Sequence, residues 1–266
     1  MYKKETFTAV ILFFILQICF AQSSFQNLEL GKNSLNYKGN PLKATDRKSL
    51  AFSDKGAWFG FGFLEQSEMQ GGFSGPFLMT EQNGVWLSSS FISLHLTDKN
   101  EQELIDWKTA LVNQNSYNSH LEQEFQNEKL EVKQQLVFSS GHSAIQKTSI
   151  TNRSSKTITL YPIYNSKTYL DNMQLSTEGQ FLKLVSSKSN AVGYIQFFNE
   201  GIDIVITKDS FTAKANKLTL KPNETKEIVV SQTYIFPQYD WKKENENLAK
   251  IQFNTVLKDT KKEKEN

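Results

Sequence analysis

The residues best suited to chemistry are four carboxylates that flank a glycine-rich segment: Asp54, Glu65, Glu68 and Glu81. A glycoside hydrolase needs two carboxyl groups roughly 5 to 9.5 Å apart across the bond that is broken. Sequence spacing does not define that separation, and acidic side chains in turns are mostly solvated. We therefore predict no catalytic residue in the chain. A small active glycosidase that uses these acids is the third and weakest of three functional alternatives.

Other kinds of catalysis have no signature in the sequence. The histidines His95, His120 and His142 lie in strand-like segments without metal-ligand spacing, so we interpret them as polar strand positions. There is no Gly-x-Ser-x-Gly elbow and no phosphate-binding loop. Lys and Arg number 30 against 28 Asp and Glu, a formal charge of +2, which would not attract a polyanion. We expect no metal, no cofactor and no nucleic-acid partner.

Aromatic residues and glycines are concentrated in three neighbouring stretches, residues 56–63, 69–77 and 84–87. Exposed rings beside glycines can stack on the flat face of a sugar, because glycine lets a ligand approach the backbone closely. Alternatively, the rings fill a β-sheet core and the glycines mark bulges or bends, and spacing alone favours this second interpretation. The candidates for contact with a carbohydrate or a neighbouring domain are Trp58, Gly71, Gly72, Phe73, Gly75, Phe77 and Trp86.

The first 21 residues have the pattern of a signal peptide. Two lysines precede an apolar run over residues 9–18, and Ala21 is a small residue at the expected cleavage position before Gln22. The run is shorter than the ~20 residues that span a bilayer. The residue before the only cysteine, Cys19, is not small, which disfavours lipidation. We expect a periplasmic or secreted protein with no disulfide, and no membrane partner after cleavage.

Apolar residues recur at every second position in segments from residue 85 to residue 236, the pattern of strands with one buried face. One such set covers residues 130–138 and is interrupted only by Gln134. Turn-forming clusters separate the segments, so successive strands are expected to be antiparallel. We predict an all-β fold, a large two-sheet antiparallel super-sandwich over residues 22–238, with residues 22–50 along its edge.

After residue 238 the sequence switches to helical spacing, with Asp240 as a candidate N-cap. The apolar residues on one face of this helix are Ala249, Phe253, Val256 and Leu257. Such a stripe needs a surface to bury against. Residues 258–266 hold four lysines and three acids and are expected to be solvated. The prediction is a helical connecting segment and charged tail over residues 239–266.

Three stretches of the sequence resemble one enzyme family. They are Lys55-Gly56-Ala57-Trp58, then Met69-Gln70-Gly71-Gly72-Phe73-Ser74-Gly75 followed by Leu78-Met79-Thr80-Glu81, and later Ala144 to Tyr164. Over about residues 40–240 the chain resembles the N-terminal β-sandwich domain of bacterial family 63 glycoside hydrolases. These include α-glucosidases related to processing glucosidase I, and mannosylglycerate-hydrolase-like enzymes.

The resemblance implies a sandwich followed by an (α/α)6 barrel that carries both catalytic acids. The expected partner is that barrel, as a domain or a separate polypeptide, with an α-linked oligosaccharide as a further ligand. Because the sequence ends about where connecting helices would begin, we predict the non-catalytic N-terminal part of an exported α-glucosidase-like enzyme. Its 71–75 loop would face the barrel, and its 249–257 stripe would form the first connecting helix. The alternative is a stand-alone secreted module that binds carbohydrate or protein.

Overall fold

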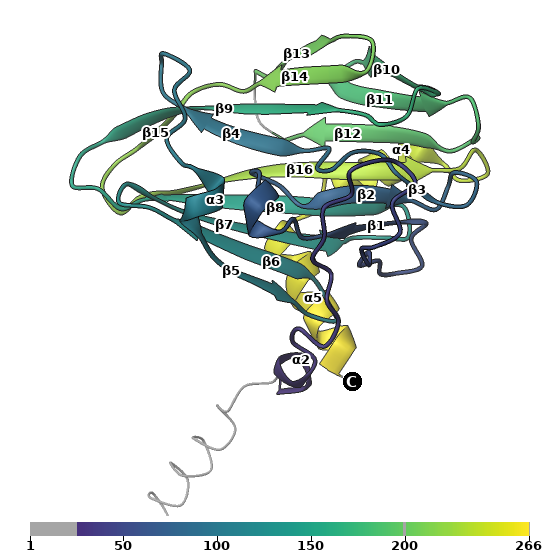
Figure 1. The fold of residues 1–266 in the computed structure, drawn as a ribbon, viewed down its shortest axis with the longest axis horizontal. Coiled ribbons are helices and arrows are strands. Elements are labelled where there is room, and N and C mark those ends of the chain that lie inside the picture. The colour runs from purple at the N-terminus through teal and green to yellow at the C-terminus, as the bar shows by residue number, and fades with distance from the viewer. Residues whose placement is uncertain (1–25, 199–200, 266) are drawn as a thin grey trace, which may run out of the picture.

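The computed structural model describes residues 26–198 and 201–265, so the predicted signal peptide over residues 1–21 lies outside the described residues. Strands dominate the described part of the chain, and its two longest helices lie at the C-terminal end (Figure 1). The strands form one sheet of eight, one of five and one of three, and all strand pairs are antiparallel. The predicted all-β sandwich is confirmed.

The largest sheet has the strand order β10-β11-β12-β16-β8-β7-β6-β5. Short turns join β5 to β8 in sequence order, and β16 lies between β8 and β12. The eight strands are β5 (Leu111–Ser116), β6 (Leu121–Gln126), β7 (Leu130–Phe138), β8 (Ser143–Asn152), β10 (Met173–Glu178), β11 (Phe181–Ser186), β12 (Val192–Phe197) and β16 (Thr225–Ile235).

The five-stranded sheet is built around β9 (Ile158–Lys167). One edge of β9 pairs with β4 (Ser93–Thr97), and its other edge pairs with β14 (Ser210–Lys214) and β15 (Leu218–Leu220). β13 (Asp203–Ile206) lies beside β14. The glycine-rich segment supplies the small third sheet, which consists of β1 (Phe59–Gly62), β2 (Ser74–Leu78) and β3 (Val85–Trp86).

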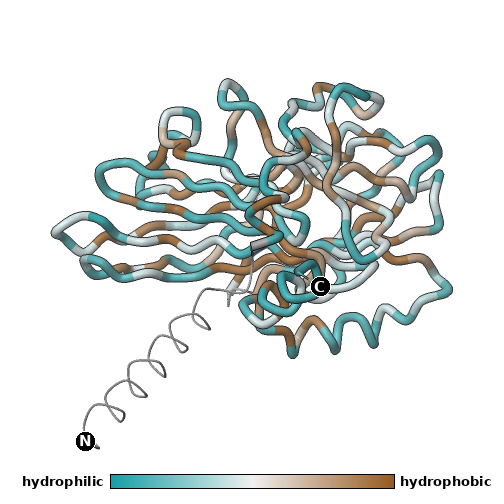
Figure 2. Tube along the Cα trace, turned by 90° about the horizontal axis from the view of Figure 1, so that it is seen from below, coloured by the Kyte–Doolittle hydropathy of each residue, from teal (hydrophilic) through white to brown (hydrophobic). Residues whose placement is uncertain are grey.

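The core consists of alternate side chains from the strands. On β7, Leu130 and Val132 are fully buried in it, whereas Glu131 between them is exposed. Tyr164 of β9 and Phe211 of β14 belong to the same cluster. Hydrophobic positions follow the strands and hydrophilic ones the connecting loops (Figure 2). Because burying each large apolar side chain is worth about 1.5–3 kcal/mol, the alternation fixes which face of each strand points inward.

Short helices occur at α2 (Gln26–Leu30), the 3-10 turn η1 (Gln66–Glu68) and α3 (Trp107–Ala110). The C-terminal segment forms two helices, α4 (Trp241–Leu248) and α5 (Phe253–Glu265). The carboxylate of Asp240 accepts a hydrogen bond from the Lys243 amide at 3.2 Å, which confirms this residue as an N-cap. No helix among the described residues is long and apolar enough to span a bilayer.

The prediction of one continuous helical stripe from Ala249 was wrong. Ala249 is the C-cap of α4, and α5 starts only at Phe253. The stripe also has a partner within this chain, because Leu248, Phe253 and Leu257 bury against Val137 and Ile145 on the outer face of the eight-stranded sheet. Ala249 and Ile251, which lie between the two helices, are apolar and so hid the break in the sequence pattern.

The prediction that residues 258–266 are solvated holds only in part. Residues 258–265 belong to α5, where Thr260 is buried, whereas Lys258, Asp259, Lys262 and Glu263 are exposed. Lys264 pairs with Asp54 at 2.6 Å, and Glu263 pairs with Lys55 at 2.8 Å. The carboxylate of Glu265 accepts hydrogen bonds from two backbone amides in α2. The many charges of this segment therefore connect α5 to the glycine-rich segment and to the start of the described chain.

Candidate functional site

The Gly-Gly-Phe-Ser-Gly motif is buried, and steric crowding explains why its first two residues are glycines. A Cβ atom on Gly71 would lie 2.0 Å from the carbonyl oxygen of Leu94, and one on Gly72 would lie 2.2 Å from that of Ile92. Real Cβ atoms do not approach backbone this closely, so the loop can pass beside β4 only without side chains at these positions. All residues from Gly71 to Gly75 are buried by their own chain.

A row of buried glutamines holds this loop from the other side. Gln114, Gln123 and Gln134 lie opposite one another on β5, β6 and β7. Their side-chain amides donate to the carbonyls of Leu64, Gly72 and Gly71, each at 3.0 Å. Gln123 also donates to Gln134 at 2.7 Å. We call this row the glutamine ladder. Sequence reasoning missed it, although Gln134 was visible as the one break in an apolar alternation.

Phe73 and Trp86 belong to the buried interior, at 3% and 1% exposure. The indole nitrogen of Trp86 donates to the carbonyl of Asp46 at 3.1 Å, and Phe77 packs edge-on against its ring at 5.1 Å. Phe77 is half-buried, with the Arg47 guanidinium 5.4 Å from its ring centre. Neither buried ring has a face free for a sugar, so these residues fit the interpretation as core.

Trp58 is the most accessible of the predicted contact residues, at 59% exposure. Its ring lies edge-on to Phe236 at 6.4 Å, and Tyr239 packs on His142 at 4.2 Å. A turn joins the two pairs, because the amide of Tyr239 donates to the carbonyl of Phe236. Met79, whose amide donates to the carbonyl of Trp58, is also exposed. We call Trp58, Met79, His142, Phe236 and Tyr239 the aromatic surface.

The four predicted carboxylates do not form one cluster of interacting groups. Asp54 pairs with Lys264, Glu65 accepts a hydrogen bond from the Asn40 amide at 3.3 Å, and Glu68 is exposed on η1. Glu81 is different, because it is only 6% exposed and no hydrogen bond or ion pair within the described residues engages its carboxylate.

The histidines occupy three separate environments. A hydrogen bond to Glu103 raises the pKa of His95, which also contacts Asn165 at 3.1 Å. His120 is fully buried beside Ser119, and burial lowers the pKa of its ring. His142 belongs to the aromatic surface. Within the described residues, no group of three or more His, Cys, Asp or Glu side chains is arranged to hold a metal ion.

His120 is part of a buried charged cluster on the outer face of the eight-stranded sheet. Glu122, 11% exposed at its side chain, lies 2.9 Å from the Lys133 ammonium and accepts a hydrogen bond from the Gln135 amide at 2.8 Å. Burial alone would raise the pKa of Glu122. The surrounding His120, Lys133 and Gln135 outweigh that effect and lower the pKa from 4.5 to about 2.

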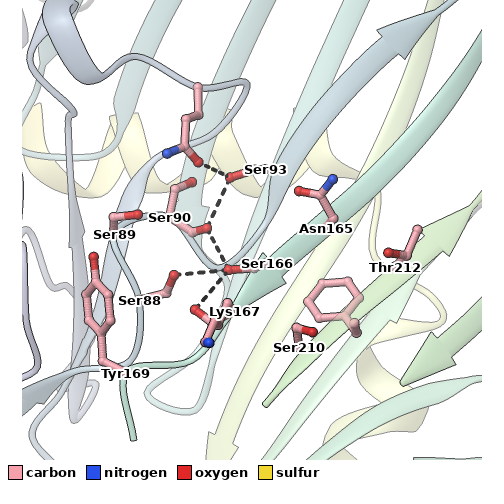
Figure 3. A pocket seen from close by; sticks show the side chains of 12 residues that line it. Ser88, Ser89, Ser90, Ser93, Asn165, Ser166, Lys167, Tyr169, Ser210 and Thr212 are labelled. Carbon is pink, nitrogen blue, oxygen red and sulfur yellow. Dashed lines mark hydrogen bonds between the residues drawn. The ribbon is translucent and has the colours of Figure 1, made fainter. Parts of the chain in front are cut away.

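An open groove of about 520 Å³ lies next to β4, β9 and β14 (Figure 3). Two amides, Gln70 and Asn165, and the half-buried ring of Tyr169 also line it. Among its lining residues, Lys167 alone carries a charge, and it pairs with Asp209 at 2.9 Å. Its serine and threonine residues are Ser88, Ser89, Ser90, Ser93, Ser166, Ser210 and Thr212.

The floor of the groove is fixed by hydrogen bonds between these groups, shown as dashed lines in Figure 3. Ser166 contacts the Ser88 hydroxyl at 3.0 Å and donates to the carbonyl of Ser90 at 3.0 Å. The Ser93 hydroxyl donates to Gln70 at 2.7 Å. The groove therefore has a polar wall held in place by hydrogen bonds. No single sequence motif indicated this wall, because its residues come from four separate segments.

Tyr169 also borders a second cavity, of about 430 Å³. The Tyr169 hydroxyl donates to the carbonyl of Pro41 at 2.8 Å, which fixes the ring between the two spaces. The buried Glu81 lines this second cavity together with Asp171 and Lys188. The groove and the Glu81 cavity are thus neighbours that share one aromatic wall.

Residues 39–196 match the family described as "Glucosidase YgjK, N-terminal". The match covers more than half of the 266 residues and includes both the glycine motif and the glutamine ladder. The chain belongs to this family. The predicted resemblance to the N-terminal sandwich of a glucosidase family is confirmed, and membership of the YgjK N-terminal family indicates a carbohydrate-related function.

Solved structures resemble this YgjK-type domain at low sequence identity. A protein assigned as a kojibiose phosphorylase from the human microbiome has a TM-score of 0.51 and 10% identity over 88% of this chain and 34% of its own. The present chain thus spans about a third of that protein. A protein from Escherichia coli K12 assigned as an aldose 1-epimerase has a TM-score of 0.48 and 8% identity, over 68% of this chain and 97% of its own. No curated protein matches the sequence.

Proposed function

We propose that the chain is the non-catalytic β-sandwich part of an exported α-glucosidase-like enzyme. In this role it supports carbohydrate breakdown beside an (α/α)6 barrel that holds both catalytic acids, whether in the same protein or on a separate polypeptide. The observation that carries the proposal is that the Gly-Gly-Phe-Ser-Gly motif is part of the buried interior of the sandwich. Gly71 and Gly72 are buried between β4 and the glutamine ladder.

The state of the acids supports the same role. The carboxylates of Asp54 and Glu65 already have partners in the chain, and the pairing of Asp54 with Lys264 connects two distant segments. A general acid must instead face the glycosidic oxygen, with a second carboxylate across the bond. Because the 71–75 loop is buried, we place the contact with the barrel at Trp58 and Phe77, the predicted contact residues with accessible ring surface.

A second candidate function is a secreted carbohydrate-binding module. The observation that favours it is the aromatic surface, on which the 59% exposed ring of Trp58 offers a face to a pyranose. Binding of an α-linked oligosaccharide that is lost in Trp58→Ala, with the fold retained, would favour this candidate.

The test of the first proposal is hydrolysis by the purified full chain. Maltose, kojibiose and a chromogenic α-glucoside are incubated with the chain, and glucose or chromophore release is measured. We expect no release above buffer. The control variants are Glu81→Gln and Asp171→Asn, because these two acids line a cavity that brings a buried carboxylate and a second acid together. Turnover that either variant abolishes would overturn the non-catalytic role.

The second arm tests the partner and the export. The chain is mixed with the barrel domain of a related glucosidase, and complex formation is followed by size-exclusion chromatography. We expect co-elution that Trp58→Ala weakens. The mass of the protein recovered from a bacterial periplasm is expected to correspond to cleavage before Gln22. Failure to co-elute, or a wholly cytoplasmic uncleaved chain, would contradict the corresponding part of the proposal.

A further inference from the structure

The side chains that line the groove suit a neutral ligand rich in hydroxyl groups. Serine and threonine hydroxyls donate and accept hydrogen bonds, as do the amides of Gln70 and Asn165. Asn165 is oriented by His95, which is itself held by Glu103. The hydroxyl of Ser90 is buried and has no hydrogen-bond partner within the described residues. A wall of this kind presents many hydrogen-bonding groups in fixed positions and no unbalanced charge.

Ligands of other classes fit this lining less well. An anion would be bound by free cationic groups, but Lys167 already pairs with Asp209. A cation would need a carboxylate, and none lines the groove itself. An apolar molecule would strip water from the hydroxyls without replacing its hydrogen bonds, which is unfavourable. A polyhydroxylated neutral molecule satisfies the same groups directly.

The neighbouring Glu81 cavity extends the surface available to such a ligand. Each space, at about 520 and 430 Å³, falls in the range of small-molecule sites. Tyr169 borders both, so a molecule longer than one ring can contact the hydroxyl wall on one side of it and Glu81 on the other. The unpaired carboxylate of Glu81 is a strong acceptor for hydroxyl donors.

We propose that the groove and the Glu81 cavity form one binding tract for a neutral oligosaccharide. The groove holds one sugar unit against its hydroxyl wall, Tyr169 contacts the linkage region, and Glu81 accepts hydrogen bonds from hydroxyls of an adjacent unit. The inference rests on the proposed function, since a carbohydrate-related role is what singles out a sugar among polyols. It assigns a non-catalytic sugar site to the sandwich itself.

The test is calorimetric titration of the full chain with maltotriose, and with tri-galacturonic acid as an anionic probe of similar size. We expect saturable binding of maltotriose, at least about tenfold tighter than the anion, because two carboxylates, Glu81 and Asp171, line the cavity against the single cation Lys188. Thr212→Val removes one groove hydroxyl at almost constant volume and is expected to weaken binding about fivefold. Tyr169→Ala, which removes the shared wall, is expected to weaken it about tenfold or more.

The matched control is Thr219→Val, which makes the same change on β15, where the Thr219 hydroxyl contacts only Thr159, at 3.3 Å on the exposed surface. We expect its affinity to stay within about twofold of wild type. Circular dichroism of each variant confirms that the fold is kept. Absence of maltotriose binding, tighter binding of the anion, or equal weakening by Thr212→Val and Thr219→Val would each overturn the tract.

Maltotriose binding that is weakened by Trp58→Ala but not by Thr212→Val would also overturn the proposed tract. The sugar would then bind at the aromatic surface. None of these outcomes alters the test of the proposed function. That test measures product release and co-elution with a barrel, and neither quantity is the affinity of the chain for maltotriose. A failed tract and a failed non-catalytic role are therefore distinguishable.

Discussion

Glu122→Gln is expected to remove a pH-dependent part of the stability of the sandwich. Glu122 lies on β6, between His120 and the Lys133 ammonium. Its Oε2 accepts from the Gln135 amide, which fixes the carboxylate. Glutamine has almost the same shape but no charge, so the substitution removes the ionic interaction while leaving the packing largely unchanged.

The magnitude follows from the pKa of Glu122, which is lowered from 4.5 to about 2 in the folded protein. Because the folded pKa is the lower one, the stabilisation is complete above the unfolded pKa and is lost as the pH falls toward 2. At about 1.4 kcal/mol for each pKa unit, Glu122 contributes about 3 kcal/mol at pH 7. Linkage predicts that about 0.8 kcal/mol of this is lost at pH 4 and about 2 kcal/mol at pH 3.

The assay is urea unfolding of wild type and Glu122→Gln at pH 7, 4 and 3, followed by circular dichroism. The difference in unfolding free energy is expected to shrink from about 3 kcal/mol at pH 7 to about 1 kcal/mol at pH 3. Glu131→Gln is the control, because its half-exposed carboxylate pairs with Arg153 at 3.1 Å and such surface pairs are worth less than about 1 kcal/mol. A Glu122→Gln difference that is unchanged between pH 7 and pH 3 would refute the reasoning.

Two further predictions separate scaffold from surface in the glycine-rich segment. Gly71→Ala forces a Cβ atom into the Leu94 carbonyl and is expected to lower the free energy of unfolding by about 3 kcal/mol or more. Gly179→Ala, at φ 60° in open space, is expected to lower it by only about 1 kcal/mol through backbone strain. Chemical denaturation measures both values, and equal losses would contradict the steric argument. Trp86→Ala is expected to lower the free energy of unfolding by about 3–5 kcal/mol, and Trp58→Ala by less than about 1 kcal/mol. Thermal unfolding compares the two variants, and a larger loss for Trp58→Ala would show that the burial assignments are reversed.

Period-two alternation was enough to predict the sandwich, because each strand buries one face and the core is continuous. β7 shows why, since Leu130 and Val132 point into the core and Glu131 points out. The same reasoning failed at the C-terminus, where Thr260 is 1% exposed but does not count as apolar. The buried face of α5 includes a hydroxyl residue, and its charged residues pair with distant parts of the chain, as Lys264 does with Asp54. In sequence such a helix has the composition of a solvated tail.

The candidate site was less accessible to sequence reasoning than the fold. The aromatic and glycine-rich motif drew attention to Trp58, which is exposed, and equally to Trp86, which is buried. The groove is assembled from serines, a threonine and amides in separate segments, and none of these residues is unusual in its local context. Spacing along the chain cannot identify such a site, because its chemistry arises only when β4, β9 and β14 meet.

The glycine motif and the interrupted alternation on β7 are two parts of one contact. The loop that holds Gly71 and Gly72 crosses the interior beside β4, so its carbonyl groups are removed from water and need donors. The backbone amides of the facing strands are already used within the sheet, and a glutamine side chain is long enough to supply an N–H instead. Gln123 provides the donor for Gly72, and Gln134 adds a second donor to Gly71, whose carbonyl also accepts from the Leu94 amide at 3.0 Å. A buried carbonyl without a donor costs about 1–3 kcal/mol, and the Gly72 carbonyl depends on Gln123 for its donor. A leucine that restored the apolar pattern at residue 134 would remove the amide oxygen that holds Gln123 in place, at 2.7 Å.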